Sequence, residues 1–243
     1  MKRSFAGRVA LVTGASSGIG RAIALAYAAR GGSVGLAGRN RRALEEVGSE
    51  IAGLGARAKA LVADLSLDES LRTLPEQVRE AFGRLDALIH AGGLYAIGPG
   101  EAGDADEVSL LWQVNARAPL LLSLACREML RESEGEIVFV NSSVVGSSAP
   151  GLAAYAASKR ALAAIADSLR ATLNEQGIRV LSVYPGRTAT PMQRRILEHE
   201  GRVYRPEALL QPDDVAYAVV HALDLPRTGE ITDIHIRPFR KLD

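Results

Sequence analysis

Short apolar segments alternate with longer helical segments along most of the chain, and this alternation restricts the fold more than any other feature. The predicted strands are 9–13, 33–37, 60–63, 85–90, 136–141, 179–183 and 231–236. The predicted helices are 19–30, 41–54, 67–82, 104–131 and 155–176. Strands that are apolar on both faces and are separated by helices indicate a parallel sheet that is covered on both sides. We therefore predict an α/β fold, a doubly wound and mostly parallel sheet with helices on both faces.

The length and composition fit one such domain over residues 1–243. A core of aliphatic layers agrees with 47% apolar residues, of which few are aromatic, and no repeat or low-complexity linker divides the chain. The 29 basic and 28 acidic residues are spread along the sequence, which argues against a nucleic-acid partner. The single cysteine, Cys126, excludes an intramolecular disulfide, and the four histidines lack metal-ligand spacing, so we expect no metal.

The chain shows no targeting or membrane segment. The residues after Met1 lack the apolar stretch of a signal peptide, and no run approaches the roughly 18 apolar residues that a membrane span needs. We expect a cytoplasmic protein without a membrane partner.

A glycine-rich segment, Thr-Gly-Ala-Ser-Ser-Gly-Ile-Gly over 13–20, follows the first strand and opens the first helix. Glycine allows a tight turn, and the unpaired N–H groups of a helix start attract an anion such as a phosphate. The alternative is a turn that only packs the helix on the strand. The predicted phosphate-binding residues are Gly14, Ser16, Ser17, Gly18, Ile19 and Gly20.

A second motif, Tyr155-Ala-Ala-Ser-Lys159, lies in the last predicted long helix. Residues four apart share one helix face, so a phenol and an ammonium lie side by side. A neighbouring cation favours the phenolate, and we expect it to lower the pKa of Tyr155 toward a value suited to acid–base catalysis. The alternative is a surface Tyr and Lys on an amphipathic helix.

The glycine spacing and the Tyr-x-x-x-Lys motif resemble those of the short-chain dehydrogenase/reductase family, from about Val9 to the C-terminus. The resemblance implies a Rossmann-like fold and a nicotinamide cofactor. It also implies that Tyr155 is the proton donor and that Lys159 holds the nicotinamide ribose. Further cofactor residues implied by the resemblance are Asp64, Leu65, Ala91, Gly92, Pro185, Gly186, Thr188 and Thr190.

The end of the second strand favours NADP(H) over NAD(H). The acidic residue that would bind an adenosine ribose is replaced by Gly38, and the next carboxylate is Glu45. A guanidinium can bind a 2′-phosphate, so we predict Arg39 as its ligand, with Arg42 or Arg21 as helpers. The alternative is a solvated basic helix start.

In the family, a serine after the fifth strand contacts the substrate oxygen, and here two serines are candidates. Matching Val144-Val145-Gly146 to the family's turn selects Ser143. Counting along the strand from Gly135, or back from Tyr155, selects Ser142, which we predict because no gap is then needed. The other serine is expected to bond to the turn.

Asn115 matches the fourth member of the family's catalytic set. Pro119, four residues later, lacks an N–H, so the carbonyl of residue 115 loses its helical partner and could hold a water that extends a proton path from Lys159. Proline could instead only kink the helix.

The chain departs from the family at one motif. His90-Ala91-Gly92-Gly93 stands where the family usually has Asn-Asn-Ala-Gly. We expect altered local bonding, with His90 buried and satisfied rather than catalytic.

These features predict an NADP(H)-dependent oxidoreductase that acts on a small carbonyl or alcohol substrate, with a substrate loop near 187–210. A catalytically silent, nucleotide-binding regulatory protein and an epimerase or dehydratase are the alternatives. The sequence does not identify the substrate or the direction of reaction. The resemblance also implies a homodimer or homotetramer.

Overall fold

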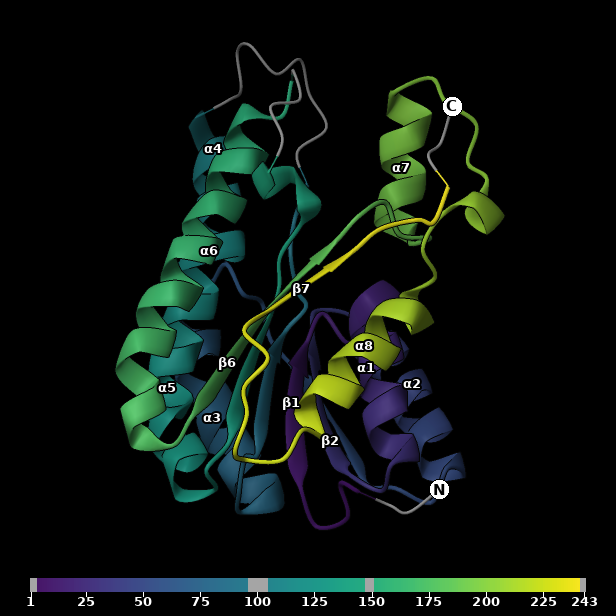
Figure 1. The fold of residues 1–243 in the computed structure, drawn as a ribbon. Coiled ribbons are helices and arrows are strands. Elements are labelled where there is room, and N and C mark those ends of the chain that lie inside the picture. The colour runs from purple at the N-terminus through teal and green to yellow at the C-terminus, as the bar shows by residue number, and fades with distance from the viewer. Residues whose placement is uncertain (1–3, 96–104, 147–150, 241–243) are drawn as a thin grey trace.

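The computed structural model describes residues 4–95, 105–146 and 151–240, which form a seven-stranded sheet between two helical layers (Figure 1). The strands are β1 (Val9–Thr13), β2 (Ser33–Gly38), β3 (Ala58–Val62), β4 (Ala87–His90), β5 (Glu136–Val140), β6 (Arg179–Pro185) and β7 (Asp233–Ile236). Their order across the sheet is β3-β2-β1-β4-β5-β6-β7, and each of these neighbouring pairs is parallel. The predicted doubly wound, Rossmann-like α/β fold is confirmed.

Helices cover both faces of the sheet, as Figure 1 shows. One layer contains α1 (Gly18–Ala29), α2 (Arg41–Gly53) and α8 (Pro212–Leu223), and the other contains α3 (Asp68–Phe82), α5 (Ala118–Glu132) and α6 (Ala153–Leu173). Successive strand side chains alternate between the layers, so that Val12 packs into the first and Leu11 into the second. None of the helices in the described residues combines the length and hydropathy needed to cross a membrane.

The single helix predicted over 104–131 is divided in two. Helix α4 (Ala105–Trp112) passes through a π-helical turn, η1 (Gln113–Arg117), into α5. The N–H of Ala118 bonds to the carbonyl of Gln113, and Pro119 follows in the first turn of α5. Because proline has no N–H, an ordinary α-helical ladder cannot continue through this segment. The interruption places Asn115 inside the π turn.

Two helices were not predicted, and one of them lies within the segment predicted to be a loop. Helix α7 (Pro191–His199) occupies much of 187–210, and a short 3₁₀ turn, η4 (Pro206–Ala208), follows it. The hydroxyl oxygen of Thr190 accepts a hydrogen bond from the Gln193 N–H at 3.1 Å, and Pro191 occupies the first helical turn. The prediction of a loop was therefore wrong at this position, because a capped helix start outweighs the Pro/Gly-rich approach to it.

The carboxyl ends of the parallel strands lie at one edge of the sheet. Gly14 follows β1, and Ala91 follows the adjacent β4. From β1 the chain adds strands toward one side of the sheet as far as β3, and from β4 it adds them toward the other side as far as β7, so the strand order reverses between β1 and β4. Ser142 is the second residue after β5, and Gly186 is the first residue after β6. In open α/β sheets, ligands bind in the crevice outside such a reversal of strand order, so the fold itself points to this edge.

Candidate active site

The glycine turn after β1 packs tightly against the start of α1. Gly14 has φ +66° and Gly18 has φ +54°, in the left-handed region that favours glycine. A Cβ on Gly20 would lie 2.4 Å from the carbonyl oxygen of Gly14, so a larger residue there would push the helix away from the turn. Ser17, just before α1, has an extended backbone and provides no side-chain cap, and the first turn of α1 holds no acidic residue. The first N–H groups of α1 are therefore available to an anion.

The segment after β4 lies directly against this turn. A Cβ on Gly14 would be 2.8 Å from the carbonyl oxygen of Ala91 and 2.7 Å from the nitrogen of Gly92. A Cβ on Gly92 would lie 2.7 Å from Cδ1 of Leu65. The Gly92 N–H donates to the hydroxyl of Thr13 at 3.1 Å. Residues predicted from three separate segments thus meet at the crevice between β1 and β4.

Arg39, at the end of β2, is exposed and has no ion pair within the described ranges. The two predicted helpers are already paired, Arg21 with Glu50 and Arg42 with Glu46. The structure therefore places the Arg39 guanidinium, without an ion pair to a described residue, between the end of β2 and the start of α2.

Asp64, after β3, lies near this guanidinium. Its Oδ1 accepts hydrogen bonds from the N–H of Ser66 at 2.9 Å and from the Ser66 hydroxyl at 2.7 Å. Burial raises the pKa of Asp64, but these bonds and the charge of Arg39 outweigh it and hold the pKa below its usual value. Asp64 is therefore an ionised acceptor at neutral pH.

Ser142 and Tyr155 are brought together at the carboxyl end of β5. The Ser142 hydroxyl lies close enough to the Tyr155 phenol to act on its pKa, and the Ser142 oxygen accepts a hydrogen bond from the Val144 N–H at 3.2 Å. Ser143 is exposed and begins the 3₁₀ turn η2 (Ser143–Gly146). Ser142 is therefore the serine that lies beside Tyr155, and its catalytic role stays a prediction.

The pKa of Tyr155 shifts in the direction opposite to our expectation. Burial raises it above its ordinary value of 10, the Ser142 hydrogen bond lowers it in part, and Tyr95 raises it further. Lys159 is itself buried, its Nζ donates to the carbonyl oxygen of Val140 at 3.1 Å, and burial lowers its pKa to about 8. The expected lowering of the phenol pKa by Lys159 is therefore wrong for this structure, because desolvation dominates both groups.

Asn115 joins three segments of the site through its side chain. Its Oδ1 accepts from the Leu94 N–H at 2.8 Å, and its Nδ2 donates to the Leu94 carbonyl at 2.9 Å and to the Ser158 hydroxyl at 3.1 Å. A Cβ on Gly93 would lie 3.2 Å from the Asn115 Oδ1 and 3.7 Å from the Lys159 Nζ. Because Gly93 has no side chain, the side chains of Asn115 and Lys159 can both approach the segment after β4.

His90 is buried at the end of β4, and its ring stacks on Phe139 with centroids 4.9 Å apart. Its Nε2 lies 2.9 Å from the hydroxyl of Ser123, which in turn donates to the carbonyl of Pro119 at 2.7 Å. Because the serine proton is used in that bond, the proton of the imidazole lies on Nε2. Burial lowers the pKa of His90 to about 3, so the ring is neutral and structural.

The segment after β6 reaches back to the glycine turn. The Gly186 N–H donates to the Ile236 carbonyl at 2.8 Å. This bond holds Pro185, the last residue of β6, against the end of β7. Thr188 is buried, and its hydroxyl donates to the Gly186 carbonyl at 2.9 Å. The methyl group of Thr190 would be 3.1 Å from a Cβ on Gly18. Of the two threonines, Thr190 is the one that lies against the glycine turn.

Three further residues border the site and were not predicted. The ring of Tyr95 lies 4.9 Å from that of Tyr155. Arg187 forms a two-pronged ion pair with Glu200, with both N–O distances at 2.9 Å. The sequence offered one signal for two of them. Tyr95 lies just after the segment 90–93, and Arg187 comes directly after Pro185-Gly186, so both follow segments that were predicted to bind the cofactor.

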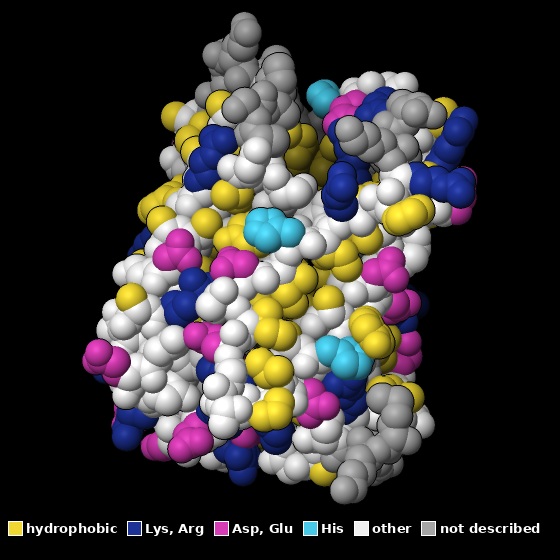
Figure 2. All heavy atoms as spheres, viewed as in Figure 1, with side chains coloured by type: hydrophobic (Ala, Val, Ile, Leu, Met, Phe, Trp, Pro, Cys, Tyr) yellow, Lys and Arg dark blue, Asp and Glu magenta, His cyan; other side chains and the backbone are white. Residues whose placement is uncertain are grey.

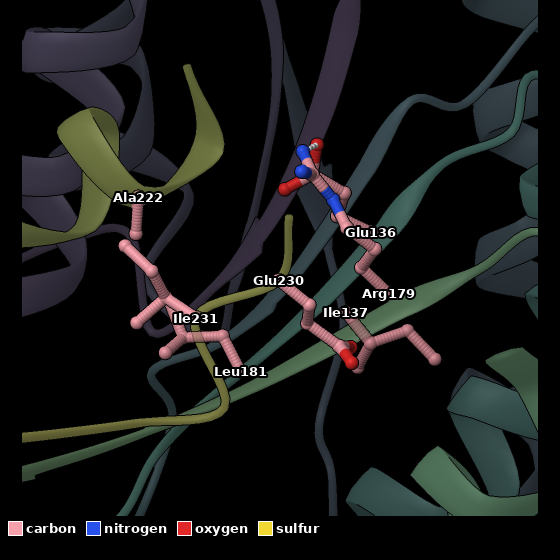
Figure 3. Close-up of a pocket in the computed structure, with 7 residues that line it drawn as sticks. All are labelled: Glu136, Ile137, Arg179, Leu181, Ala222, Glu230 and Ile231. Carbon is pink, nitrogen blue, oxygen red and sulfur yellow. Dashed lines mark hydrogen bonds and ion pairs between the residues drawn. The ribbon is translucent and has the colours of Figure 1, made fainter. Parts of the chain in front are cut away.

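A small cavity lies at the opposite edge of the sheet and is not part of this site (Figure 3). It measures about 10 Å³, which is room for one water molecule. Glu136 and Arg179, the first residues of β5 and β6, form an ion pair in its wall at 2.6 Å. Its size and position indicate a structural feature.

Comparison with known proteins agrees with this geometry. Residues 8–201 match the family described as short chain dehydrogenase. The chain is 31% identical over 232 residues to an uncharacterized oxidoreductase of Staphylococcus epidermidis, which covers 95% of this chain and 97% of that protein.

Among solved structures, a short chain dehydrogenase from Burkholderia cenocepacia in complex with NADP is 33% identical, with a TM-score of 0.86 over 96% of this chain and 97% of that one. An alcohol dehydrogenase from Thermococcus sibiricus, complexed with 5-hydroxy-NADP, is 25% identical, with a TM-score of 0.87 over 97% of this chain and 98% of that one.

Proposed function

The chain belongs to the short-chain dehydrogenase/reductase family of oxidoreductases, and from this premise we propose that it moves a hydride between NADP(H) and a carbonyl or alcohol substrate. The observation that carries the proposal is the meeting of Ser142, Tyr155 and buried Lys159 at the sheet edge that holds the glycine turn. A phenol and a hydroxyl that lie this close together can both form a hydrogen bond with the same substrate oxygen.

The residues of the crevice fit a dinucleotide that carries an additional phosphate. The uncapped start of α1 offers N–H groups to the pyrophosphate, and the unpaired Arg39 offers a fork of donors to a 2′-phosphate. The similar Burkholderia protein, solved with NADP, supports this choice. When bound, the cofactor supplies or accepts the hydride. The proposed cofactor-binding residues are Gly14, Ser16, Ser17, Gly18, Ile19, Gly20, Arg39, Asp64, Leu65, Ala91, Gly92, Tyr155, Lys159, Pro185, Gly186, Thr188 and Thr190.

Tyr155 is the general acid in reduction and the general base in oxidation. Its raised pKa keeps the phenol protonated at neutral pH, which suits donation of a proton to a carbonyl oxygen. Ser142 holds that oxygen by a hydrogen bond and orients the Tyr155 hydroxyl at the same time. In oxidation the same proton returns to Tyr155, and the phenolate that accepts it becomes more abundant as pH rises.

Lys159 and Asn115 support this proton transfer. Lys159 holds the nicotinamide ribose, and its pKa of about 8 allows it to exchange a proton near neutral pH. Asn115 fixes the π turn to Leu94 and Ser158, and we place the water that extends the proton path at this turn. These are positioning and relay roles, whereas Tyr155 is the catalytic residue.

Turnover distinguishes this function from that of a silent nucleotide-binding protein. The purified protein is mixed with NADPH or NADH and a panel of aldehydes and ketones, and consumption of the reduced cofactor is followed. We expect consumption with at least one carbonyl compound and a kcat/KM for NADPH at least about ten-fold above that for NADH, because a charge-assisted fork is lost with NADH. Binding of NADPH without consumption across the panel would favour the regulatory alternative.

A further inference from the structure

We propose that Arg187 is a specificity-determining residue, which binds the carboxylate of an oxo acid or hydroxy acid substrate while Tyr155 and Ser142 address its carbonyl or alcohol oxygen. In the free protein the carboxylate of Glu200 forms an ion pair with the Arg187 guanidinium, and the substrate carboxylate displaces it. The inference rests on the proposed oxidoreductase function and names the substrate class of that site.

Arg187 is placed on the substrate side of the site by the fold. It follows Gly186 at the carboxyl end of β6, which pairs with β5, and β5 leads into Ser142. Tyr95 links this position to the reactive group, because its ring contacts that of Tyr155 at 4.9 Å. Burial raises the pKa of Tyr95, and Glu200 raises it while Arg187 lowers it, so both charges act on the phenol beside Tyr155.

The Arg187–Glu200 pair has the geometry of carboxylate recognition. Both terminal nitrogens of the guanidinium donate to the two carboxylate oxygens at 2.9 Å. This planar, two-pronged arrangement is the one that arginine offers to any carboxylate. The side chains are 35% and 30% exposed, so a dissolved anion can reach the pair.

Glu200 is shared by two partly exposed arginines, because the Nη1 of Arg202 also lies 4.0 Å from its Oε2 and can keep the carboxylate paired when Arg187 is released. It caps the C-terminus of α7, where the partial negative charge of the helix end disfavours a carboxylate. A partly exposed ion pair contributes little net stability, because water also satisfies both ions. A substrate carboxylate of the same geometry can therefore replace Glu200 at small cost.

The surrounding charge favours an anion over a cation. Residues 187–210 contain five arginines and three glutamates, with no lysine or aspartate. Figure 2 shows the basic side chains gathered over α7 and the segment that follows it, beside a recess in which hydrophobic side chains are visible. Displacing Glu200 with an external carboxylate leaves Arg187 paired, whereas a cation bound at Glu200 would leave Arg187 without its acceptor.

The test measures binding by calorimetry to the protein saturated with NADP⁺, so that it does not depend on turnover. The probes are 2-oxobutanoate, 4-oxopentanoate and 5-oxohexanoate, each compared with its methyl ester, which keeps the ketone and removes the charge. The variants are R187M and E200Q. R195M is the control for net charge, because it removes an exposed arginine that lies on α7 and not at the proposed site. NADPH consumption with the same probes is measured separately.

We expect at least one acid to bind the wild-type protein more tightly than its ester. R187M should weaken binding of that acid by at least about ten-fold, which corresponds to loss of a charge-assisted pair, with little change for the ester. E200Q should tighten binding of the acid, and R195M should leave its Kd within about two-fold. Unchanged ester binding in R187M shows that the variant is folded.

Equal binding of acid and ester in the wild type, absence of binding by all three acids, or an equal loss in R187M and R195M would overturn the inference. NADPH consumption with the neutral esters would still support the proposed function in each of these cases. Failure of the protein to bind NADP⁺ would contradict the proposed function itself, and the inference with it.

Discussion

Two adjacent serines follow β5, but their hydroxyl groups have different surroundings. Ser142 lies close enough to Tyr155 to act on its pKa and accepts a hydrogen bond from the Val144 N–H, whereas Ser143 is exposed on the turn η2. Neighbouring residues at the end of a strand point in different directions, so one of them alone is suited to hold a substrate oxygen.

Replacing each serine separately tests this assignment. Ser142→Ala should lower kcat by about 10²-fold or more, because an oriented donor to the reacting oxygen is lost. Ser143→Ala is the matched control, and its kcat should stay within about three-fold of wild type. Steady-state kinetics with any accepted carbonyl compound gives the comparison. The reverse ranking of the two variants would contradict the assignment.

Cofactor choice also depends on single residues. Gly38→Asp or Arg39→Asp should shift the ratio of kcat/KM from NADPH toward NADH by at least about ten-fold, because a carboxylate repels the 2′-phosphate and binds a ribose hydroxyl. Arg42→Asp is the control, since Arg42 is already paired with Glu46 at 3.0 Å and should change the ratio little. A wild-type protein that prefers NADH would disprove the role of Arg39.

The sequence predicted site residues where a local pattern places them. The helical spacing of Tyr155 and Lys159 and the glycine turn are such patterns. The direction of the Tyr155 pKa was missed because burial is set by packing between distant segments. Tyr95 and Arg187 were missed for the same reason. Neither the ring contact between Tyr95 and Tyr155 nor the effect of the Arg187 charge on Tyr95 is visible as spacing in the sequence.

At the scale of elements, the start of α1 depends on its contact with the turn after β1. Gly20→Ala would place a methyl group 2.4 Å from the Gly14 carbonyl, inside any normal contact distance. We expect the variant to shift the first turn of α1 and to weaken NADPH binding by at least about ten-fold, since the proposed phosphate donors lie there.

Gly53→Ala is the matched control, because a Cβ at Gly53 meets nothing within 4 Å at the end of α2. This control should leave NADPH binding unchanged and stabilise the fold by about 0.5–1 kcal/mol. Titration of NADPH and urea unfolding of both variants check the two expectations. Wild-type NADPH affinity in Gly20→Ala would show that the tight contact is not needed.

The strands and most helices were predictable, because a central parallel strand is apolar on both faces and a helix repeats every three to four residues. The π turn was not predictable. It depends on the missing N–H of Pro119 together with the hydrogen bonds of the Asn115 side chain, which join segments far apart in the sequence. Helices α7 and α8 were missed although their starts are marked. Thr190 caps α7, and Gln211 and Asp214 form a capping box at α8.

At the scale of the whole molecule, the two edges of the sheet have different roles. The carboxyl edge carries the crevice and its reactive groups. The amino edge carries buried charge, where Glu136 accepts from Arg179 at 2.6 Å and from Arg8 at 3.3 Å. Burial raises the pKa of Glu136, and the two arginines offset that rise in part. We expect this edge to stabilise the fold and to take no part in the proposed chemistry.

Removing the buried charge should therefore destabilise the protein without affecting cofactor choice. Glu136→Gln should lower the free energy of unfolding by about 3 kcal/mol, because Arg179 and Arg8 lose their shared partner. Glu134→Gln changes an exposed residue at the same edge and should alter it by less than about 0.5 kcal/mol. Urea unfolding measures both. Equal stability of the two variants would contradict the structural role of the cluster.

The central claim, hydride transfer with Tyr155 as the acid, is tested most directly by isotope transfer. NADPH carrying deuterium in place of both hydrogens at C4 of its nicotinamide ring is incubated with the protein and an accepted ketone, and the alcohol is analysed by mass spectrometry. We predict one deuterium on the new alcohol carbon with the wild type and with Tyr217→Phe, which alters an exposed tyrosine of α8. Tyr155→Phe should bind NADPH and form no alcohol. Alcohol without deuterium, or labelled alcohol from Tyr155→Phe at the wild-type rate, would contradict the account.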